Sequence, residues 1–129
     1  MKIFLTLLLL STTTFAFSNP QRRECLQKNG EFIVADIEND QVALCKIGHS
    51  YIGALDLVYL TSNQPTESLI NYSHRQLSCL GKEIQTTVND SGELKLLCLH
   101  DDGSLIDVES LQLGRDSAQN LVLNSALGL

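Results

Sequence analysis

Aromatic residues are scarce in this chain: tryptophan is absent, and Phe, Trp and Tyr together make up 5% of the 129 residues. Sites that bind sugars or nucleobases commonly stack them on aromatic rings, so this scarcity counts against both ligand classes. Positive charge is scarce as well, because nine Lys and Arg stand against fifteen Asp and Glu. Nucleic acids and anionic lipids bind basic clusters, so we expect no nucleic-acid partner and no electrostatic attachment to lipid.

Residues 1–18 predict a secretory signal peptide, in which a basic start (Met1-Lys2) precedes a short apolar stretch and then small residues. The apolar stretch falls well short of the about 20 residues that a membrane helix needs. We expect cleavage after Ser18, with Ala16 as the second choice, and a periplasmic or secreted chain without stable membrane insertion. Without Lys2, eight basic residues stand against fifteen acidic ones, a net charge of −7. The simplest interpretation is that this charge maintains solubility, and it also leaves room for a basic partner.

The four cysteines all lie beyond the signal peptide and predict two disulfide bonds. A zinc site is the alternative, but its ligands usually come as pairs two to four residues apart, and no two cysteines here are that close. The count alone leaves three pairings open. The cysteines are Cys25, Cys45, Cys79 and Cys98.

A four-residue motif occurs twice, as Cys-Leu-Gln-Lys at 25–28 and Cys-Leu-Gly-Lys at 79–82, with an offset of 54 positions. The same offset relates three further pairs: Ser50 and Ser104, Ile52 and Ile106, Leu57 and Leu111. Matches in one order at one offset favour internal duplication. If each unit closes its own bridge, the disulfides are Cys25–Cys45 and Cys79–Cys98.

Apolar alternation and turn residues predict an α+β fold of two tandem small repeats, packed as one disulfide-braced domain. Each repeat is a short helix plus a three-stranded antiparallel meander. The predicted helices cover 19–30 and 66–81, and the predicted strands cover 31–37, 42–47, 51–60, 83–88, 93–99 and 104–113. The third strand of the first repeat has an end that can run into a helix. The predicted segments are a signal peptide (1–18), repeat unit 1 (19–60), a linker (61–67), repeat unit 2 (68–114) and a C-terminal tail (115–129).

Two expectations concern how these segments pack. Each unit has an apolar strand face and too few residues to cover it, so we expect the two faces to meet. Their residues are Phe32, Val34, Leu94 and Leu96. The tail is ambiguous, because its apolar residues fit an added strand, a cover over the core or a frayed end.

The turns and cysteines follow a known order: Asn-Pro, Cys, Gly, a hairpin that ends in Cys, and a Gly-Ser turn. The matching residues are Asn19, Pro20, Cys25, Gly30, Cys45, Ser50, Cys79, Cys98, Asp102, Gly103 and Ser104. This pattern resembles a small exported bacterial domain family of unknown function whose members often carry a hemolysin label. Asn29 replaces the first Gly of a pair, Tyr51 and Leu105 replace a further Cys, and the family's Trp is missing. The resemblance spans most of the chain after residue 18 as two degenerate copies, and it implies bacterial export without implying any catalytic residue.

Familiar catalytic motifs are absent from the sequence, including the nucleophile elbow, the zinc-binding HExxH helix and the P-loop. Two acidic turns, Asn89–Glu93 and His100–Asp102, invite a metal interpretation, but neither has the spacing of a calcium loop. Turn chemistry alone explains their Asp, Asn and Gly. We therefore assign no catalytic residue, no metal ligand, no cofactor and no partner-binding residue.

Together these features predict an exported, non-enzymatic binding or interaction protein of the bacterial cell envelope. Its partner is an unidentified protein, and an inhibitor of a basic secreted hydrolase such as a lysozyme or protease is one form of this function. The alternative is a small secreted hydrolase or metal-dependent enzyme that uses His49, His74 or His100. A third is an envelope protein without a discrete ligand.

Overall fold

A computed structural model describes residues 19–88 and 92–129. The signal-peptide prediction for residues 1–18 and the turn prediction at 89–91 lie outside these ranges. No helix within the described residues has the length and apolar character needed to cross a bilayer.

In the part of the chain that the structure describes, six antiparallel strands form one sheet in the order β1-β2-β3-β6-β5-β4, so the fold is α+β as predicted. Each of the two meanders contributes three neighbouring strands, and β3 joins β6 through the pairing of Ile52 with Ile106. Both halves therefore contribute to a single sheet. The strands are β1 (Glu31–Ile37), β2 (Asp40–Ile47), β3 (Ser50–Gly53), β4 (Lys82–Thr87), β5 (Leu94–Leu99) and β6 (Leu105–Asp107).

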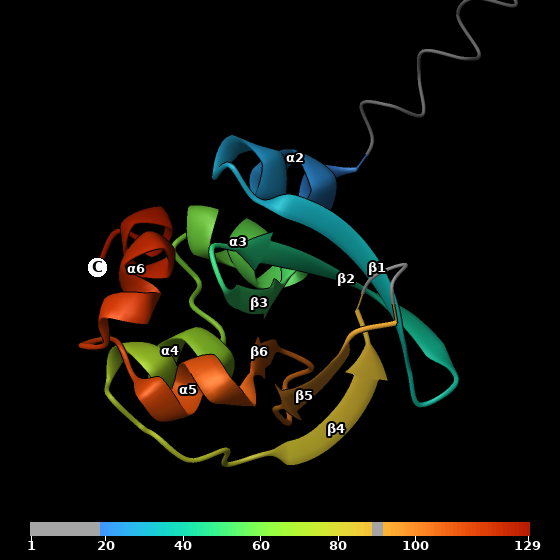
Figure 1. The fold of residues 1–129 in the computed structure, drawn as a ribbon. Coiled ribbons are helices and arrows are strands. Elements are labelled where there is room, and N and C mark those ends of the chain that lie inside the picture. The colour runs from blue at the N-terminus through green and yellow to red at the C-terminus, as the bar shows by residue number, and fades with distance from the viewer. Residues whose placement is uncertain (1–18, 89–91) are drawn as a thin grey trace, which may run out of the picture.

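The sheet is curled, so that its two edge strands, β1 and β4, approach each other at the right of the view in Figure 1. The Thr86 hydroxyl donates a hydrogen bond to the Asp36 carbonyl oxygen at 2.6 Å. Lys82, at the start of β4, pairs with Glu38, the residue after β1. The curl gives the sheet an inner and an outer face.

Within the described residues, five α-helices and one 3₁₀ helix accompany the sheet, and α4, α5 and α6 gather at the left in Figure 1. The local sequence explains where α2 begins. The Asn19 side chain accepts a hydrogen bond from the Arg22 amide, and Pro20 occupies the first position of the helix. The helices are α2 (Pro20–Gln27), α3 (Ala54–Thr61), α4 (Glu67–Ser73), α5 (Val108–Leu113), η1 (Ala118–Asn120) and α6 (Leu121–Leu127).

Successive side chains of a strand point to opposite faces, and here each face has its own apolar cluster. The inner cluster comes from the strands and the residue after β4: Ala35, Ile37, Leu44, Tyr51, Val88, Leu97 and Leu105. The outer cluster joins strand and helix residues: Cys25, Cys45, Ile47, Ile52, Leu57, Leu69, Tyr72, Cys98, Ile106, Val108, Leu111 and Leu123. Full burial of one such aliphatic side chain contributes roughly 1.5–3 kcal/mol.

Two disulfide bonds brace the sheet from its outer face. Cys25 of α2 bonds to Cys45 of β2, and Cys79 bonds to Cys98 of β5. This is the pairing expected if each half closes its own bridge. In the chain-entropy model, closing loops of this length stabilises the fold by on the order of 3 kcal/mol per bridge.

The helix predicted over 66–81 is too long, because α4 ends at Ser73. Arg75 has a φ of 60°, a left-handed conformation that a helix cannot continue through. The chain then runs as an irregular segment, 74–81, that brings Cys79 to its partner on β5. Thr61 belongs to α3 and Glu67 begins α4, so the connection between the halves is shorter than the predicted linker.

The prediction that Val34, Leu94 and Leu96 form buried faces between the halves is wrong. Val34 and Leu94 are 56% and 59% exposed, and Leu96 is exposed as well. Phe32 is partly buried against the outer cluster. Both faces of the strands carry apolar residues, so alternation alone does not identify the face that becomes buried.

The C-terminal tail, which was ambiguous from sequence, forms η1 and α6 and covers part of the outer cluster. Leu123 is 1% exposed in this position. The tail therefore packs as a cover rather than as an added strand.

Candidate functional site

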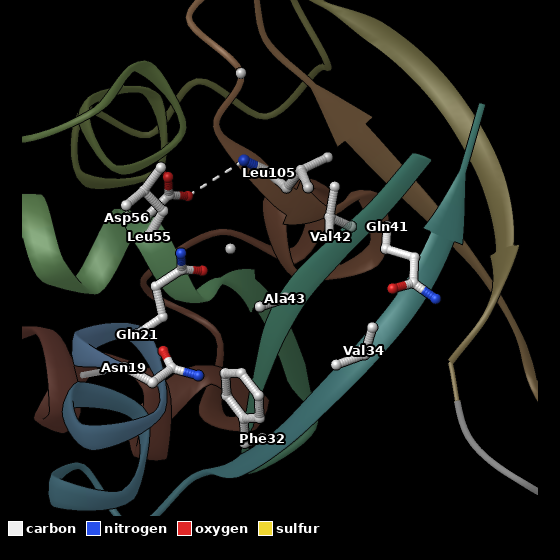
Figure 2. Close-up of a pocket in the computed structure, with 12 residues that line it drawn as sticks. Asn19, Gln21, Phe32, Val34, Gln41, Val42, Ala43, Leu55, Asp56 and Leu105 are labelled. Carbon is white, nitrogen blue, oxygen red and sulfur yellow. Dashed lines mark hydrogen bonds between the residues drawn. The ribbon is translucent and has the colours of Figure 1, made fainter. Parts of the chain in front are cut away.

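A groove of about 440 Å³ lies where α2, β1, β2, α3 and the turn before β6 meet. Its walls are largely apolar and come from Phe32, Val34, Val42, Leu55 and Leu105. Three side-chain amides line it as well, from Asn19, Gln21 and Gln41. Figure 2 shows the amides of Asn19 and Gln21 between α3 and the β1 wall. The one ionisable residue among the described lining residues is Asp56.

The groove exists because β3 is shorter than β2. The ladder between them runs from the pair Ile47–Ser50 to the pair Leu44–Gly53, and the chain then turns into α3. The first part of β2 continues past this point, paired with β1. Gln41, Val42 and Ala43 therefore line a gap that a longer β3 would fill.

Asp56 lies in the first turn of α3 and is 2% exposed. Its Oδ2 accepts a hydrogen bond from the Leu105 amide at 3.2 Å, drawn as a dashed line in Figure 2. Burial raises the pKa of this carboxyl to about 8, the Leu105 hydrogen bond opposes that rise, and the charge of Asp102 adds to it. The buried Thr66 hydroxyl is close enough to lower that pKa slightly, yet makes no hydrogen bond of ordinary geometry within the described residues. At neutral pH the groove therefore contains a mostly protonated carboxyl group.

A second buried carboxyl, Asp107, occupies the matching junction but does not line the groove. Its Oδ1 accepts from the Tyr51 amide at 2.8 Å, and its Oδ2 accepts from the Ser110 amide at 3.0 Å. Burial raises the pKa of Asp107, and these hydrogen bonds oppose that rise. Nearby, the Asn120 amide donates to the Ser110 and Gly114 carbonyl oxygens. The polar groups of this cluster bond to one another and to the nearby backbone, so we assign the cluster a structural role.

The three histidines occupy different environments. His49, in the turn before β3, and His74, at the C-terminal end of α4, are both exposed. His100 is 3% exposed, and its Nδ1 lies 2.8 Å from the Ser68 hydroxyl oxygen. Within residues 19–88 and 92–129, no group of three or more His, Cys, Asp or Glu side chains is placed to hold a metal ion. Part of the Asn89–Glu93 turn lies outside those ranges.

The Ser68–His100 pair has the contact that nucleophilic catalysis requires between a hydroxyl and a base. Ser68, however, has no exposed surface. Its backbone amide and hydroxyl are both engaged, the amide with the Ser104 hydroxyl at 3.0 Å. A substrate carbonyl cannot reach Ser68 in this arrangement, so the contact organises the turn before β6.

The disulfide cysteines are where the sequence predicted them, but sequence reasoning did not find Asp56. The one available signal was a carboxyl within the apolar run 51–60, a pattern that a buried functional group can produce. The groove itself depends on the length of β3 and on the position of α2. No protein-family model, no curated protein and no solved structure matches this chain, so the family resemblance rests on the residues alone.

Proposed function

We propose that this chain is an exported, non-enzymatic binding protein whose groove receives a basic side chain of a partner protein. The observation that carries the proposal is the Asp56 carboxyl, the one ionisable group among the described lining residues of a largely apolar groove. Apolar walls suit the methylene stem of Lys or Arg, whereas a carboxyl suits its charged end. The groove is thus matched to a long side chain that ends in a cation.

The electrostatic surroundings support a cationic group rather than an anionic one. Asp102 lies close enough to Asp56 to raise its pKa, so both charges would attract the same cation. The net charge of −7 without residues 1–18 would steer a basic protein toward the chain over longer distances. A basic secreted hydrolase, such as a lysozyme or protease, is the partner class to test first, with inhibition as the expected consequence.

A cation bound beside Asp56 favours the ionised carboxyl, so binding expels the proton. Because the pKa of the free carboxyl is about 8, affinity should increase as the pH rises toward 8. The limiting dependence is about tenfold per pH unit. Above that pH the carboxyl is already ionised, and affinity should level off.

The test uses residues 19–129 and two matched probes, N-acetylarginine methylamide and N-acetylcitrulline methylamide. The probes have similar shapes, but only the first is charged. We expect the arginine probe alone to shift the NMR signals of Leu55, Gly103 and Leu105, more strongly at pH 8 than at pH 6. Asp56→Asn should abolish the difference between probes, whereas Glu83→Gln, which removes an exposed charge from β4, should preserve it.

Three results would decide against this function. Equal binding of both probes would show that charge is not recognised. Affinity that falls with rising pH would show that the protonated carboxyl donates to an acceptor instead. Failure of lysozymes and basic proteases to bind or be inhibited would remove the partner class named above.

The alternative function is a hydrolase centred on His100 and Ser68. It is favoured by the 2.8 Å contact between them and opposed by their burial. A fluorophosphonate probe tests it, because such reagents label activated serines. Labelling of Ser68 in the folded protein would establish the alternative, whereas we expect none.

Export and internal duplication belong to the same proposal. Two disulfides are typical of proteins from oxidising compartments, which agrees with the signal-peptide pattern of residues 1–18. The order helix, three strands, helix occurs in both halves, as α2-β1-β2-β3-α3 and α4-β4-β5-β6-α5. The central pair Ile52–Ile106 has the sequence offset of the repeated motif. These features support descent from one duplicated unit.

A further inference from the structure

The two disulfides lie in different surroundings. Cys25 and Cys45 are both 0% exposed, one on a helix and the other within a strand. The Gly30 backbone packs directly against their sulfur atoms, because a Cβ at that position would lie 2.3 Å from Cys45 Sγ. A reagent in solution has no path to this bridge while the fold is intact.

The two cysteines of the second bridge differ in their burial. Cys98 is 0% exposed within β5, but Cys79 is only partly buried. Cys79 also belongs to the segment 74–81, which is neither helix nor strand. An attacking thiol would therefore meet the Cys79 sulfur first and leave Cys98 as the departing group.

The buried end of this bridge lies beside an imidazole ring. Cys98 Sγ is 3.7 Å from Nε2 and 3.9 Å from Nδ1 of His100. The Ser68 hydroxyl engages Nδ1, which leaves Nε2 for the sulfur. In thiol–disulfide exchange the rate depends on how well the leaving thiolate is stabilised, and a nearby protonated imidazole stabilises it.

We propose that Cys79–Cys98 is a redox-active disulfide that thiols open at Cys79, with His100 stabilising the departing Cys98 thiolate. An external thiolate attacks Cys79 Sγ, the Cys79–Cys98 bond breaks, and the bonding electron pair remains on Cys98. A second thiol attacks the mixed disulfide and releases Cys79. The protein gains two electrons and two protons, and two thiols become one disulfide. Cys25–Cys45 remains a structural bond.

Any pH dependence of the exchange reaction also involves the charged groups near His100. Asp102, in the same turn, is the carboxylate whose pKa responds to the His100 charge. Burial alone would raise the pKa of Asp102, but hydrogen bonds from the Glu67 amide and from Ser104 outweigh it and lower the pKa. An ionised Asp102 therefore contributes a negative charge to the turn that follows His100.

The experiment treats the folded oxidised chain 19–129 with reduced glutathione and quenches samples with acid. New thiols are blocked with one isotopic form of N-ethylmaleimide, remaining disulfides are reduced, and their thiols receive the other form. Peptide masses then report both bridges in the same sample. We expect Cys79 and Cys98 to become accessible at least tenfold faster than Cys25 and Cys45. Equal rates, or the reverse order, would overturn the proposal.

His100→Gln tests the assignment of the imidazole, with the Cys25–Cys45 rate as the internal control. Rates are first corrected for the thiolate fraction of glutathione. The variant should then react several-fold more slowly than the wild type at Cys79–Cys98 and equally fast at Cys25–Cys45. An unchanged rate at Cys79–Cys98 would overturn the role of His100. Faster reduction of both bridges would show global opening and would also overturn it.

Discussion

The Asp107 carboxylate accepts a hydrogen bond from the Tyr51 amide at 2.8 Å and thereby ties the start of α5 to β3 in the other half of the chain. Asp56 does the reverse, since it lies on α3 of the first half and accepts from the Leu105 amide of β6. Each half therefore supplies a buried carboxyl to the backbone of the other. The two carboxyls connect the halves at the short β3–β6 junction, where strand pairing is limited to Ile52 and Ile106.

Asp107→Ala should lower the free energy of unfolding by about 2–4 kcal/mol, because the buried Tyr51 and Ser110 amides lose their acceptor. Asp107→Asn keeps one side-chain acceptor, so it should lower the free energy of unfolding by less than Asp107→Ala does. Urea unfolding of both variants measures the effect. Glu109→Ala, which removes an exposed carboxyl from the same helix, should change stability little. Equal losses in Asp107→Ala and Glu109→Ala would contradict the buried-acceptor role.

Asp56 should make stability decrease as pH rises. Its folded pKa of about 8 lies above the ordinary value of 3.8, so between these values the folded state holds a proton that the unfolded state releases. The stabilisation is fully present below pH 3.8 and is lost as pH rises to about 8. Its slope approaches about 1.4 kcal/mol per pH unit.

Asp56→Asn should remove that slope, and the difference between wild-type and variant urea curves from pH 4 to pH 9 measures it. Subtraction cancels groups that titrate alike in both proteins. Parallel stability profiles for the two proteins would show that Asp56 is ionised throughout, which the burial argument does not allow.

The three histidines should differ in their effect on folding. His49→Ala and His74→Ala change exposed side chains and should alter stability by less than about 0.5 kcal/mol. His100→Ala removes a buried ring and leaves the Ser68 hydroxyl without its hydrogen-bond partner. This should lower the free energy of unfolding by about 1–3 kcal/mol. The burial of His100 distinguishes it from the two exposed histidines. Thermal melts of the single variants measure the difference, and equal melting temperatures for all three would contradict the structural role of His100.

A fragment of residues 19–62 should be unstable or should dimerise. It retains β1, β2, β3 and α3 but exposes the edge of β3 and the buried Ile52 and Leu57. An edge strand with an uncovered apolar face is prone to pair with another copy. Analytical ultracentrifugation and a melting curve provide the test. A monomeric fragment that melts like the whole chain would mean that the halves fold independently.

The hairpins were predictable because local signals determine them. Alternating apolar residues and the turns at Glu38-Asn39 and Gly48-His49 define β1, β2 and β3 without reference to distant residues. The duplicated spacing likewise indicated which cysteines lie together. The helix of the second half was mispredicted because its end depends on the distant Cys98, to which Cys79 is bonded.

The groove and the exposure of Val34 and Leu94 depend on long-range geometry. The curl of the sheet decides which face of each strand is enclosed, and apolar residues occupy both faces. Asp56 becomes part of a site only because β3 ends at Gly53 and Leu105 approaches from the other half. The sequence shows that Asp56 carries a carboxyl, but it does not show that the Leu105 amide contacts it.

Asn120 and Leu123 are buried although they belong to the last ten residues of the chain. Without η1 and α6, the outer cluster would lack Leu123, and the Ser110 and Gly114 carbonyl oxygens would lack the Asn120 amide that binds them. A tag or fusion that displaces residues 118–127 would therefore disturb the core as well as the surface.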